Sequence, residues 1–186
     1  MSSPRNVAVL VGSLRKESFN RKMARAMIAM APPSLKLEIV EIGQLPHYNQ
    51  DFDADPPQEV NDFKARIQQA DAVLFVTPEY NRSVPGLLKN AIDVGSRPYG
   101  KSEWNGKPGA VLSLSPGAIG AFGANHHLRQ SFVFLNIPAM PQPEAYIGGA
   151  AKMFGEDGAI ISDDTREFVN KFLQAFAQWI EKNIAS

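Results

Sequence analysis

The 186-residue sequence contains no cysteine. Disulfide bridges, thiolate nucleophiles and thiolate-bound metal ions are therefore excluded, and a reducing compartment is compatible with the chain. The sequence also has no apolar run near the roughly 18 residues that a membrane-spanning helix needs. Its first residues lack the charged start and apolar stretch of a secretion signal. We therefore expect a cytoplasmic protein with no membrane partner.

An excess of one charge is also lacking, because 19 Lys and Arg residues balance 19 Asp and Glu residues. Nucleic-acid-binding domains normally have a basic excess, and a strongly acidic surface would favour docking on basic proteins. We therefore expect a small-molecule partner and no nucleic acid. The length fits one α/β domain, and no repeat, low-complexity tract or linker divides it. Residues 1–186 are predicted to form a single domain.

Continuous apolar runs bounded by polar residues recur along the chain, as is typical of strands buried on both faces. Segments with apolar residues at helical spacing lie between them. The expected strands cover residues 7–11, 35–42, 71–77 and 110–115, and a short fifth strand limited by prolines is expected within residues 139–147. The expected helices cover residues 21–31, 58–69, 87–94, a segment around 128–135, and a last helix that begins near Asp164.

The last helix has the clearest pattern. Asp164 and Glu167 have the spacing of a capping box at its start. Aromatic and aliphatic residues recur on one face, and we assign them to the core rather than to a cofactor site. These residues are Phe168, Val169, Phe172, Leu173, Phe176, Trp179 and Ile180.

Strands that alternate with helices predict a parallel sheet with right-handed crossovers. The five-stranded doubly wound solution has the strand order 2-1-3-4-5, with helices on both faces. Ligands of such sheets bind beyond the carboxyl ends of the strands, where the order reverses between strands one and three. The loops that leave those two strands are therefore the first candidates for a site.

Residues 12–20 link the first expected strand to the first helix. Backbone N–H groups at a helix start, with the positive end of the helix dipole behind them, favour an anion such as phosphate. Ser13, Ser18 and Asn20 can bond phosphate oxygens, and Arg15 can add a charge-assisted contact. Neither a Walker A motif nor a dinucleotide fingerprint is present, so a single phosphate monoester fits better. The alternative is that Ser18 or Asn20 merely caps the helix.

Two further loops leave neighbouring strands. Residues 77–86 contain a proline near each end and form a rigid turn, whose peptide groups cannot all be paired locally. Residues 115–123 are rich in glycine, which lets a backbone approach a flat ring closely. A phosphate at the first loop and a flat group across the other two describe flavin mononucleotide (FMN) in a flavodoxin-like fold. A mobile loop that leads into a helix is the alternative for residues 115–123.

These three loops carry a family resemblance. The matching segments are GSLRKESFN at residues 12–20, TPEYNRSVPGLLKNAID at 77–93, and SPG at 115–117 with LRQ at 128–130. They resemble the NADPH-dependent FMN reductase family, and within it the bacterial quinone and chromate reductase branch. The resemblance runs from about residue 6 to residue 147, and its second segment is the most specific.

The resemblance implies noncovalently bound FMN in a flavodoxin-like α/β domain. Its implied phosphate ligands are Ser13, Arg15, Ser18 and Asn20. The residues that it places along the isoalloxazine ring, mostly through backbone contacts, are Pro78, Glu79, Tyr80 and Asn81, with Ser115 and Gly117 on the far side. No side chain is implied as a catalytic acid or base, since the chemistry takes place on the flavin.

The implied activity is an NADPH- or NADH-dependent two-electron reduction of quinones, with side activity on chromate and other acceptors. Arg82 and Arg97 are expected to hold nicotinamide phosphates or an anionic acceptor, and the alternative is that they are solvated. Two flavin-based alternatives remain, namely an electron carrier and an enzyme that releases reduced FMN. A phosphate-binding regulator without flavin is the remotest one.

The resemblance also implies a homodimer or homotetramer. Members of this branch often carry an arginine and a tyrosine that join a carboxylate across a subunit contact. The corresponding places here are Gly123 and His126, while Glu144 keeps the carboxylate. His126 and His127 are adjacent and would point about 100° apart on a helix, so they are expected at the surface or an interface rather than on one metal ion.

Overall fold

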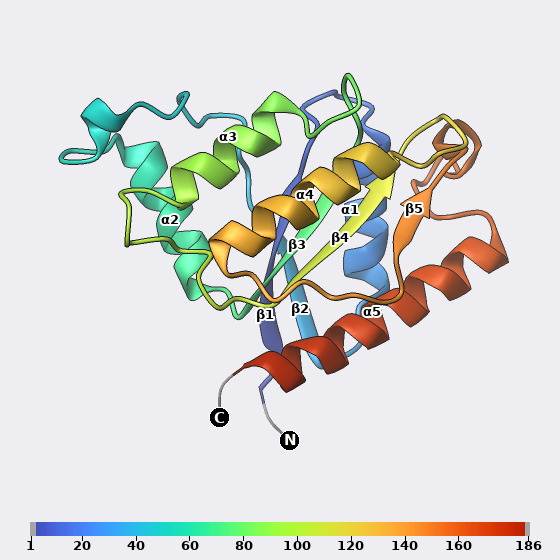
Figure 1. The fold of residues 1–186 in the computed structure, drawn as a ribbon. Coiled ribbons are helices and arrows are strands. Elements are labelled where there is room, and N and C mark those ends of the chain that lie inside the picture. The colour runs from blue at the N-terminus through green and yellow to red at the C-terminus, as the bar shows by residue number, and fades with distance from the viewer. Residues whose placement is uncertain (1–2, 185–186) are drawn as a thin grey trace.

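The computed structural model describes residues 3–184 as a parallel five-stranded sheet with the order β2-β1-β3-β4-β5. Both the flavodoxin-like fold and the strand order are confirmed (Figure 1). The strands are β1 Arg5–Val11, β2 Leu35–Ile39, β3 Ala72–Thr77, β4 Gly109–Leu114 and β5 Ala145–Ile147.

The last strand is short, as predicted. A short strand limited by prolines was expected within residues 139–147, and the described strand has three residues, Ala145–Ile147. Pro141 and Pro143 precede it, and a proline has no N–H to donate to a sheet ladder. Only an isolated bridge between Gly109 and Ala139 continues the pairing upstream.

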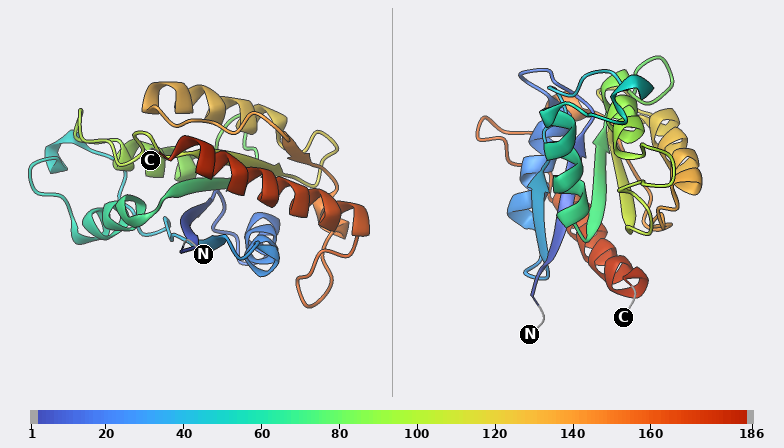
Figure 2. Two further views of the ribbon diagram at one scale, coloured as in Figure 1. Left: turned by 90° about the horizontal axis from the view of Figure 1, so that it is seen from below. Right: turned by 90° about the vertical axis from the view of Figure 1, so that its left-hand side faces the viewer.

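Helices connect the strands and cover both faces of the sheet. The five α-helices are α1 Phe19–Met30, α2 Gln58–Gln69, α3 Gly86–Gly95, α4 Phe122–Leu135 and α5 Asp163–Asn183. Short 3-10 turns lie at Gln50–Phe52 and Ala150–Lys152. The right-hand view of Figure 2 shows α1 and α4 on opposite sides of the strands. Among residues 3–184, no helix is long and apolar enough to cross a membrane.

Two separate apolar layers hold the helices on the sheet. Val7, Val9 and Val11 of β1 face the layer that contains the buried residues of α1 and α5. Ala8 and Leu10 face the other layer, which contains the buried residues of α2, α3 and α4. Successive side chains of a strand point to opposite faces, so a strand with both faces covered is apolar throughout. This is why the continuous apolar runs predicted the central strands correctly.

The start of α5 differs from the prediction. Ser162 is the N-cap, and its hydroxyl accepts a hydrogen bond from the amide of Thr165 at 3.3 Å. The predicted capping box with Asp164 at the cap is therefore wrong, because Asp164 already lies in the first helical turn. A serine one residue before Asp163 offers an equally good cap, and the two-residue shift places both acids where the helix dipole favours them. The buried face of α5 is as predicted, with Val169, Phe172, Leu173, Phe176 and Ile180 fully enclosed.

Candidate functional site

The carboxyl edge of the sheet collects the buried polar side chains of the described chain. Three loops meet there, after β1, β3 and β4, at the upper edge in Figure 1. Within residues 3–184, every buried polar or charged side chain belongs to these strand ends, these loops or the helix starts that follow. They are Ser13, Ser18, Asn20, Thr77, Ser113 and Asn125. Because buried polar groups are costly unless they are paired, this concentration indicates a functional edge.

The loop after β1 is held mainly by its own residues. The Ser18 hydroxyl accepts from the amide of Arg21 at 3.2 Å, so Ser18 is the N-cap of α1 as the alternative interpretation expected. The Ser13 hydroxyl accepts from the amide of Arg15 at 3.4 Å. The Arg15 guanidinium donates to the carbonyl of Glu17 and lies 4.7 Å from the centre of the Phe19 ring. Arg15 is exposed, and its remaining N–H donors are available to an anion.

Asn20 connects this loop to the neighbouring strand. Its side-chain amide donates to the carbonyl of Leu114, at the end of β4, at 3.3 Å. Its Oδ1 atom is buried and is the one buried side-chain polar atom in residues 3–184 without a hydrogen-bond partner. A buried acceptor without a donor costs about 1–3 kcal/mol, so the site lacks a donor at this point.

The loop after β3 contains a tight turn. The backbones of Tyr80 and Ser83 exchange two hydrogen bonds, of 3.1 and 3.0 Å. The two residues between them, Asn81 and Arg82, both have positive φ angles, of 52° and 64°. Asn tolerates this conformation better than most residues, whereas Arg is held in it by the surrounding structure. The Thr77 hydroxyl donates to the carbonyl of Pro78 at 2.7 Å and fixes the entry to the turn.

The side chain of Glu79 is directed toward the start of α4. Its Oε2 accepts from the amide of Ala124, in the first turn of α4, at 3.1 Å. Its Oε1 lies 3.6 Å from the guanidinium of Arg82. The structure therefore joins the loop after β3 to the helix that follows the glycine-rich loop.

The glycine-rich loop after β4 is packed against the last strand. The Ser113 hydroxyl donates to the carbonyl of Gly120 at 2.7 Å. Gly120 has a φ of 62°, and a side chain there would meet the backbone of Tyr146 at 2.5 Å. The Ser115 hydroxyl donates to the carbonyl of Gly117 at 3.2 Å. Contacts with β4 and with the backbone of β5 therefore hold this loop in place in the structure.

Two residues that the sequence analysis did not single out help to assemble this edge. A side chain at Gly12 would lie 2.9 Å from the Thr77 hydroxyl, so the glycine lets the ends of β1 and β3 approach each other. Asn125 donates to both Ser113 and Ala145 beneath the glycine-rich loop. Gly12 directly follows an apolar run, so its position could have been identified from the sequence, whereas no local sequence pattern identifies Asn125.

The two predicted arginines lie in different places. Arg82 is at the tip of the turn after β3, beside the other predicted residues. Arg97 follows the far end of α3, with its guanidinium 5.9 Å from the centre of the Tyr48 ring. It lines a pocket between α2, the end of α3 and residues 46–53, and the structure does not bring it to the three loops.

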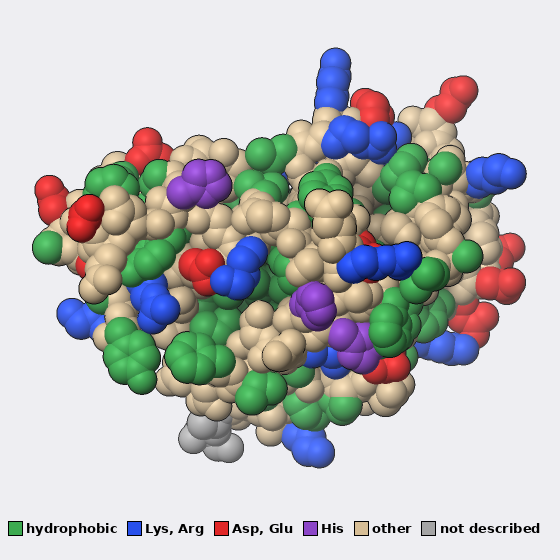
Figure 3. Space-filling model, turned by 45° about the horizontal axis from the view of Figure 1, so that its top comes forward, with side chains coloured by type: hydrophobic (Ala, Val, Ile, Leu, Met, Phe, Trp, Pro, Cys, Tyr) green, Lys and Arg blue, Asp and Glu red, His purple; other side chains and the backbone are tan. Residues whose placement is uncertain are grey.

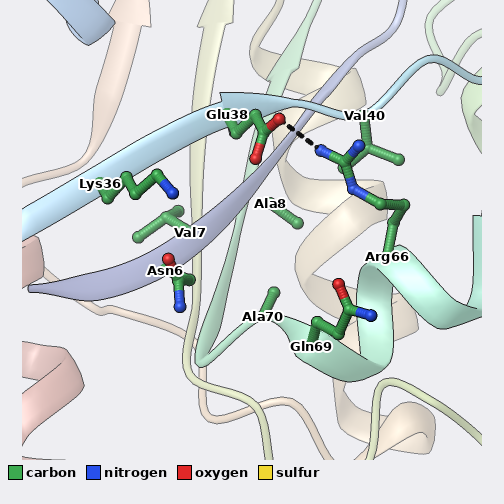
Figure 4. Close-up of a pocket in the computed structure, with 9 residues that line it drawn as sticks. All are labelled: Asn6, Val7, Ala8, Lys36, Glu38, Val40, Arg66, Gln69 and Ala70. Carbon is green, nitrogen blue, oxygen red and sulfur yellow. Dashed lines mark ion pairs between the residues drawn. The ribbon is translucent and has the colours of Figure 1, made fainter.

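The surface around the three loops carries both charged and apolar side chains. Figure 3 shows Lys and Arg side chains interspersed with apolar ones on the face that carries them. One apolar side chain of each loop is more than half exposed, namely Leu14, Tyr80 and Ile119. A separate hollow over β1, β2 and the end of α2 contains none of the predicted site residues (Figure 4). Its Arg66 and Glu38 form a solvent-exposed ion pair, 2.8 Å long, of the kind that contributes little to stability.

The two histidines of α4 are exposed, as expected, and contact different partners. His126 Nε2 lies 2.9 Å from the hydroxyl of Tyr146, and His127 Nδ1 lies 2.9 Å from the hydroxyl of Ser83. Burial, together with the nearby Glu144 carboxylate, raises the pKa of Tyr146 to about 12. His126 therefore contacts the neutral tyrosine hydroxyl of its own chain.

Comparison with known proteins assigns the family. The family model described as NADPH-dependent FMN reductase matches residues 5–152, which include all three loops. The chain belongs to this family. FMN reductase family members are oxidoreductases, so the predicted FMN- and NAD(P)H-dependent oxidoreductase class is confirmed.

Relatives of the FMN reductase family match the chain over nearly its whole length. A quinone reductase from Pseudomonas putida is 62% identical over 186 residues, which is 100% of both chains. A 2-hydroxy-1,4-benzoquinone reductase from a Burkholderia species is 48% identical and covers 94% of this chain and 95% of its own. The solved structure of FerB, a flavoenzyme NAD(P)H:acceptor oxidoreductase from Paracoccus denitrificans, has a TM-score of 0.91 and 46% identity, and covers 96% of this chain and 98% of its own.

The residues at the carboxyl edge fit FMN. The unpaired Oδ1 of Asn20 can accept from a ribityl hydroxyl, which supplies the missing donor. The first-turn amides of α1 have no partners within their helix and suit a phosphate. Gly117 leaves its part of the loop without a side chain, and the only atom near a Cβ there would be the Ser115 hydroxyl at 3.8 Å, so a ring can approach the backbone at this point. This edge is therefore the candidate FMN site.

Proposed function

We propose that this chain is a flavoenzyme that uses NADPH or NADH for the two-electron reduction of quinones, with FMN held noncovalently at the carboxyl edge. The observation that carries the proposal is the unpaired, buried Asn20 Oδ1 among the loops of an FMN reductase family member. Its 62% identity to a quinone reductase over the full chain supports a quinone as the acceptor.

The chain's own residues bind and orient the cofactor. Ser13, Arg15, Ser18 and Asn20 hold the phosphate and the adjoining hydroxyls. Pro78, Glu79, Tyr80 and Asn81 place the backbone of the rigid turn along one edge of the ring, and Ser115 and Gly117 close the other side. Bound FMN supplies the redox chemistry by accepting two electrons from the nicotinamide and passing them to the acceptor.

Acceptor access is set by the exposed rim of the site. Tyr80 and Ile119 offer apolar contact area of the kind that a quinone ring buries. Arg82 lies in the same turn with its guanidinium mostly exposed, and it attracts nicotinamide phosphates or an anionic acceptor such as chromate. Arg97 fills this role only if the cofactor extends from the three loops to the end of α3.

A flavin-binding electron carrier is the second candidate, because carriers share this fold. The balanced charge of the chain disfavours it, since carriers dock through a strong field of one sign. An enzyme that releases reduced FMN is the third candidate. It would lose its flavin during turnover, so dialysis after reduction separates it from the proposed enzyme.

The proposal includes assembly into a homodimer or homotetramer and a cytoplasmic location. Val133 and Phe134 at the end of α4, and Tyr99 beside them, are 83%, 74% and 81% exposed. Tyr99 and Phe134 share one surface hollow. Exposed apolar side chains in a group are typical of contact surfaces. Light scattering tests the assembly, and a monomer of 20.4 kDa would contradict it.

The decisive experiment is a visible spectrum of the FMN-reconstituted, desalted protein, recorded anaerobically. We expect a retained flavin spectrum that bleaches with NADPH and returns when a benzoquinone is added. Retained flavin that NADPH cannot bleach would support the carrier instead. Loss of all flavin on desalting, with no measurable FMN affinity, would overturn the proposal.

A further inference from the structure

The N-terminus of α4 has no cap from its own sequence. Its N-cap residue is Ala121, with a φ of 59°, and an alanine side chain accepts no hydrogen bond. The first turn of α4 also contains no acidic residue. First-turn amides need an outside acceptor, because they have none within their helix. For Ala124 this acceptor is Glu79, which lies 45 residues earlier in the chain.

The carboxylate of Glu79 is enclosed at this position. Its side chain is 13% exposed, and both oxygens are engaged. Oε2 accepts from the Ala124 amide at 3.1 Å, and Oε1 lies 3.6 Å from the guanidinium of Arg82. A negative charge at a helix N-terminus is also favoured by the helix dipole.

The space for this carboxylate depends on Gly123. A side chain at residue 123 would lie 2.9 Å from Glu79 Oε2 and 2.9 Å from the carbonyl of Arg82. In this chain, a side chain at residue 123 would therefore force the carboxylate and the turn to shift from the positions described here. The glycine and the carboxylate form one fitted contact between α4 and the turn after β3.

A second contact joins the same two elements. Ser83, which closes the turn, has its hydroxyl 2.9 Å from Nδ1 of His127, one helical turn beyond Ala124. The turn that contains Asn81 and Arg82 in positive-φ conformations is thus attached to α4 on both sides. Positive-φ residues other than glycine persist only where their surroundings hold them.

We propose that Glu79 is a positioning residue, which caps α4 and thereby fixes the turn after β3 relative to the glycine-rich loop. This inference rests on the proposed function, in which these two loops lie on opposite sides of the flavin ring. Glu79 acts through the backbone of the turn and the start of α4, and its carboxylate neither touches the acceptor nor transfers a proton. Gly123 is the residue that makes the contact possible.

The test compares Glu79→Ala, Glu79→Gln and Gly123→Ala with the unchanged protein. The control is Ser162→Ala, which removes a helix cap from α5, away from the three loops. For each variant we would measure the Kd of FMN, the absorption spectrum of bound FMN, the melting temperature, and hydrogen exchange of the Ala124 amide with and without FMN.

We expect Glu79→Ala and Gly123→Ala to raise the Kd of FMN about tenfold, to shift the flavin spectrum and to speed exchange at Ala124, because one charge-assisted hydrogen bond is lost. Glu79→Gln keeps an oxygen acceptor and should restore most of the affinity and spectrum. Ser162→Ala should lower the melting temperature without changing the Kd or the spectrum.

Three results would overturn the inference. They are an unchanged Kd and spectrum in Glu79→Ala, a Glu79→Gln variant as impaired as Glu79→Ala, and an equal loss of FMN affinity in Ser162→Ala. An unchanged protein that binds no FMN would instead defeat the proposed function. In that case, faster exchange at Ala124 in Glu79→Ala without FMN would still support the fixed contact, and unchanged exchange would refute it.

Discussion

The loop after β1 and the loop after β4 both line the candidate FMN site, but they are ordered by different means. Ser13, Arg15 and Ser18 contact residues no more than four positions away in the chain. The glycine-rich loop instead rests on the backbone of Tyr146 and on Ser113, and the helix after it on Glu79. The contacts of a loop held by its sequence neighbours can be predicted from the sequence, whereas the contacts of a loop held by distant strands cannot.

Gly120→Ala breaks the loop that depends on distant contacts, and we expect it to have the largest effect. The new side chain would lie 2.5 Å from the Tyr146 backbone at a residue with a φ of 62°. We expect a loss of about 1–3 kcal/mol or more in the free energy of unfolding, measured by denaturant titration.

Gly117→Ala is the matched control in the same loop. Its only near neighbour would be the Ser115 hydroxyl, at 3.8 Å. We expect a change in unfolding free energy within about 0.5 kcal/mol. Equal losses in the two variants would show that the loop is not held through Gly120.

Arg15→Ala tests whether the locally ordered loop binds the phosphate. We expect FMN binding to weaken by about 1.5–3 kcal/mol, the range for hydrogen bonds to a charged group, which is roughly 10- to 150-fold in Kd. Flavin fluorescence titration gives the Kd. Arg25→Ala removes the same charge from an exposed position of α1 and should change little. An unchanged Kd in Arg15→Ala would remove Arg15 from the site.

Ser18→Ala separates the capping role of the first loop from its binding role. Loss of the N-cap bond to Arg21 should cost about 1 kcal/mol of unfolding free energy without FMN. Ser162→Ala, at the other side-chain-capped α-helix, should cost about the same. Only Ser18→Ala should also weaken FMN binding, and equal FMN affinities in the two variants would leave Ser18 as a cap alone.

The smallest expected effect is a shift in the pH at which Tyr146 titrates. Tyr146 lies in β5, the strand that supports the glycine-rich loop. Its pKa is raised to about 12 in the folded protein, against about 10 in the unfolded chain. The neutral form is therefore favoured by folding, so its contribution to stability is complete below pH 10 and is lost between about pH 10 and 12. The ultraviolet absorbance of tyrosinate should show a group that titrates near pH 12 and that Tyr146→Phe removes, beside Tyr48, whose pKa burial also raises. A titration near pH 10 for all four tyrosines would contradict it.

Prediction from the sequence was correct where the pattern involves residues that are close together in the chain. The apolar runs of β1 and β3 and the helix that stops before Pro32 were predicted correctly, since strand and helix patterns repeat over a few residues. It failed at the start of α5, where Ser162 and Asp164 are both good caps. It also extended the second strand to residue 42, whereas β2 ends at Ile39.

The sequence by itself determined the doubly wound fold, the strand order and the three loops that leave β1, β3 and β4. Local residue types and the handedness of crossovers are enough for that. Only the tertiary structure decided that Glu79 caps α4, that Asn20 retains an unpaired oxygen, and that Arg97 lies beside Tyr48. Each of these three features depends on how the helices and loops pack on the sheet, and no local sequence pattern encodes that packing.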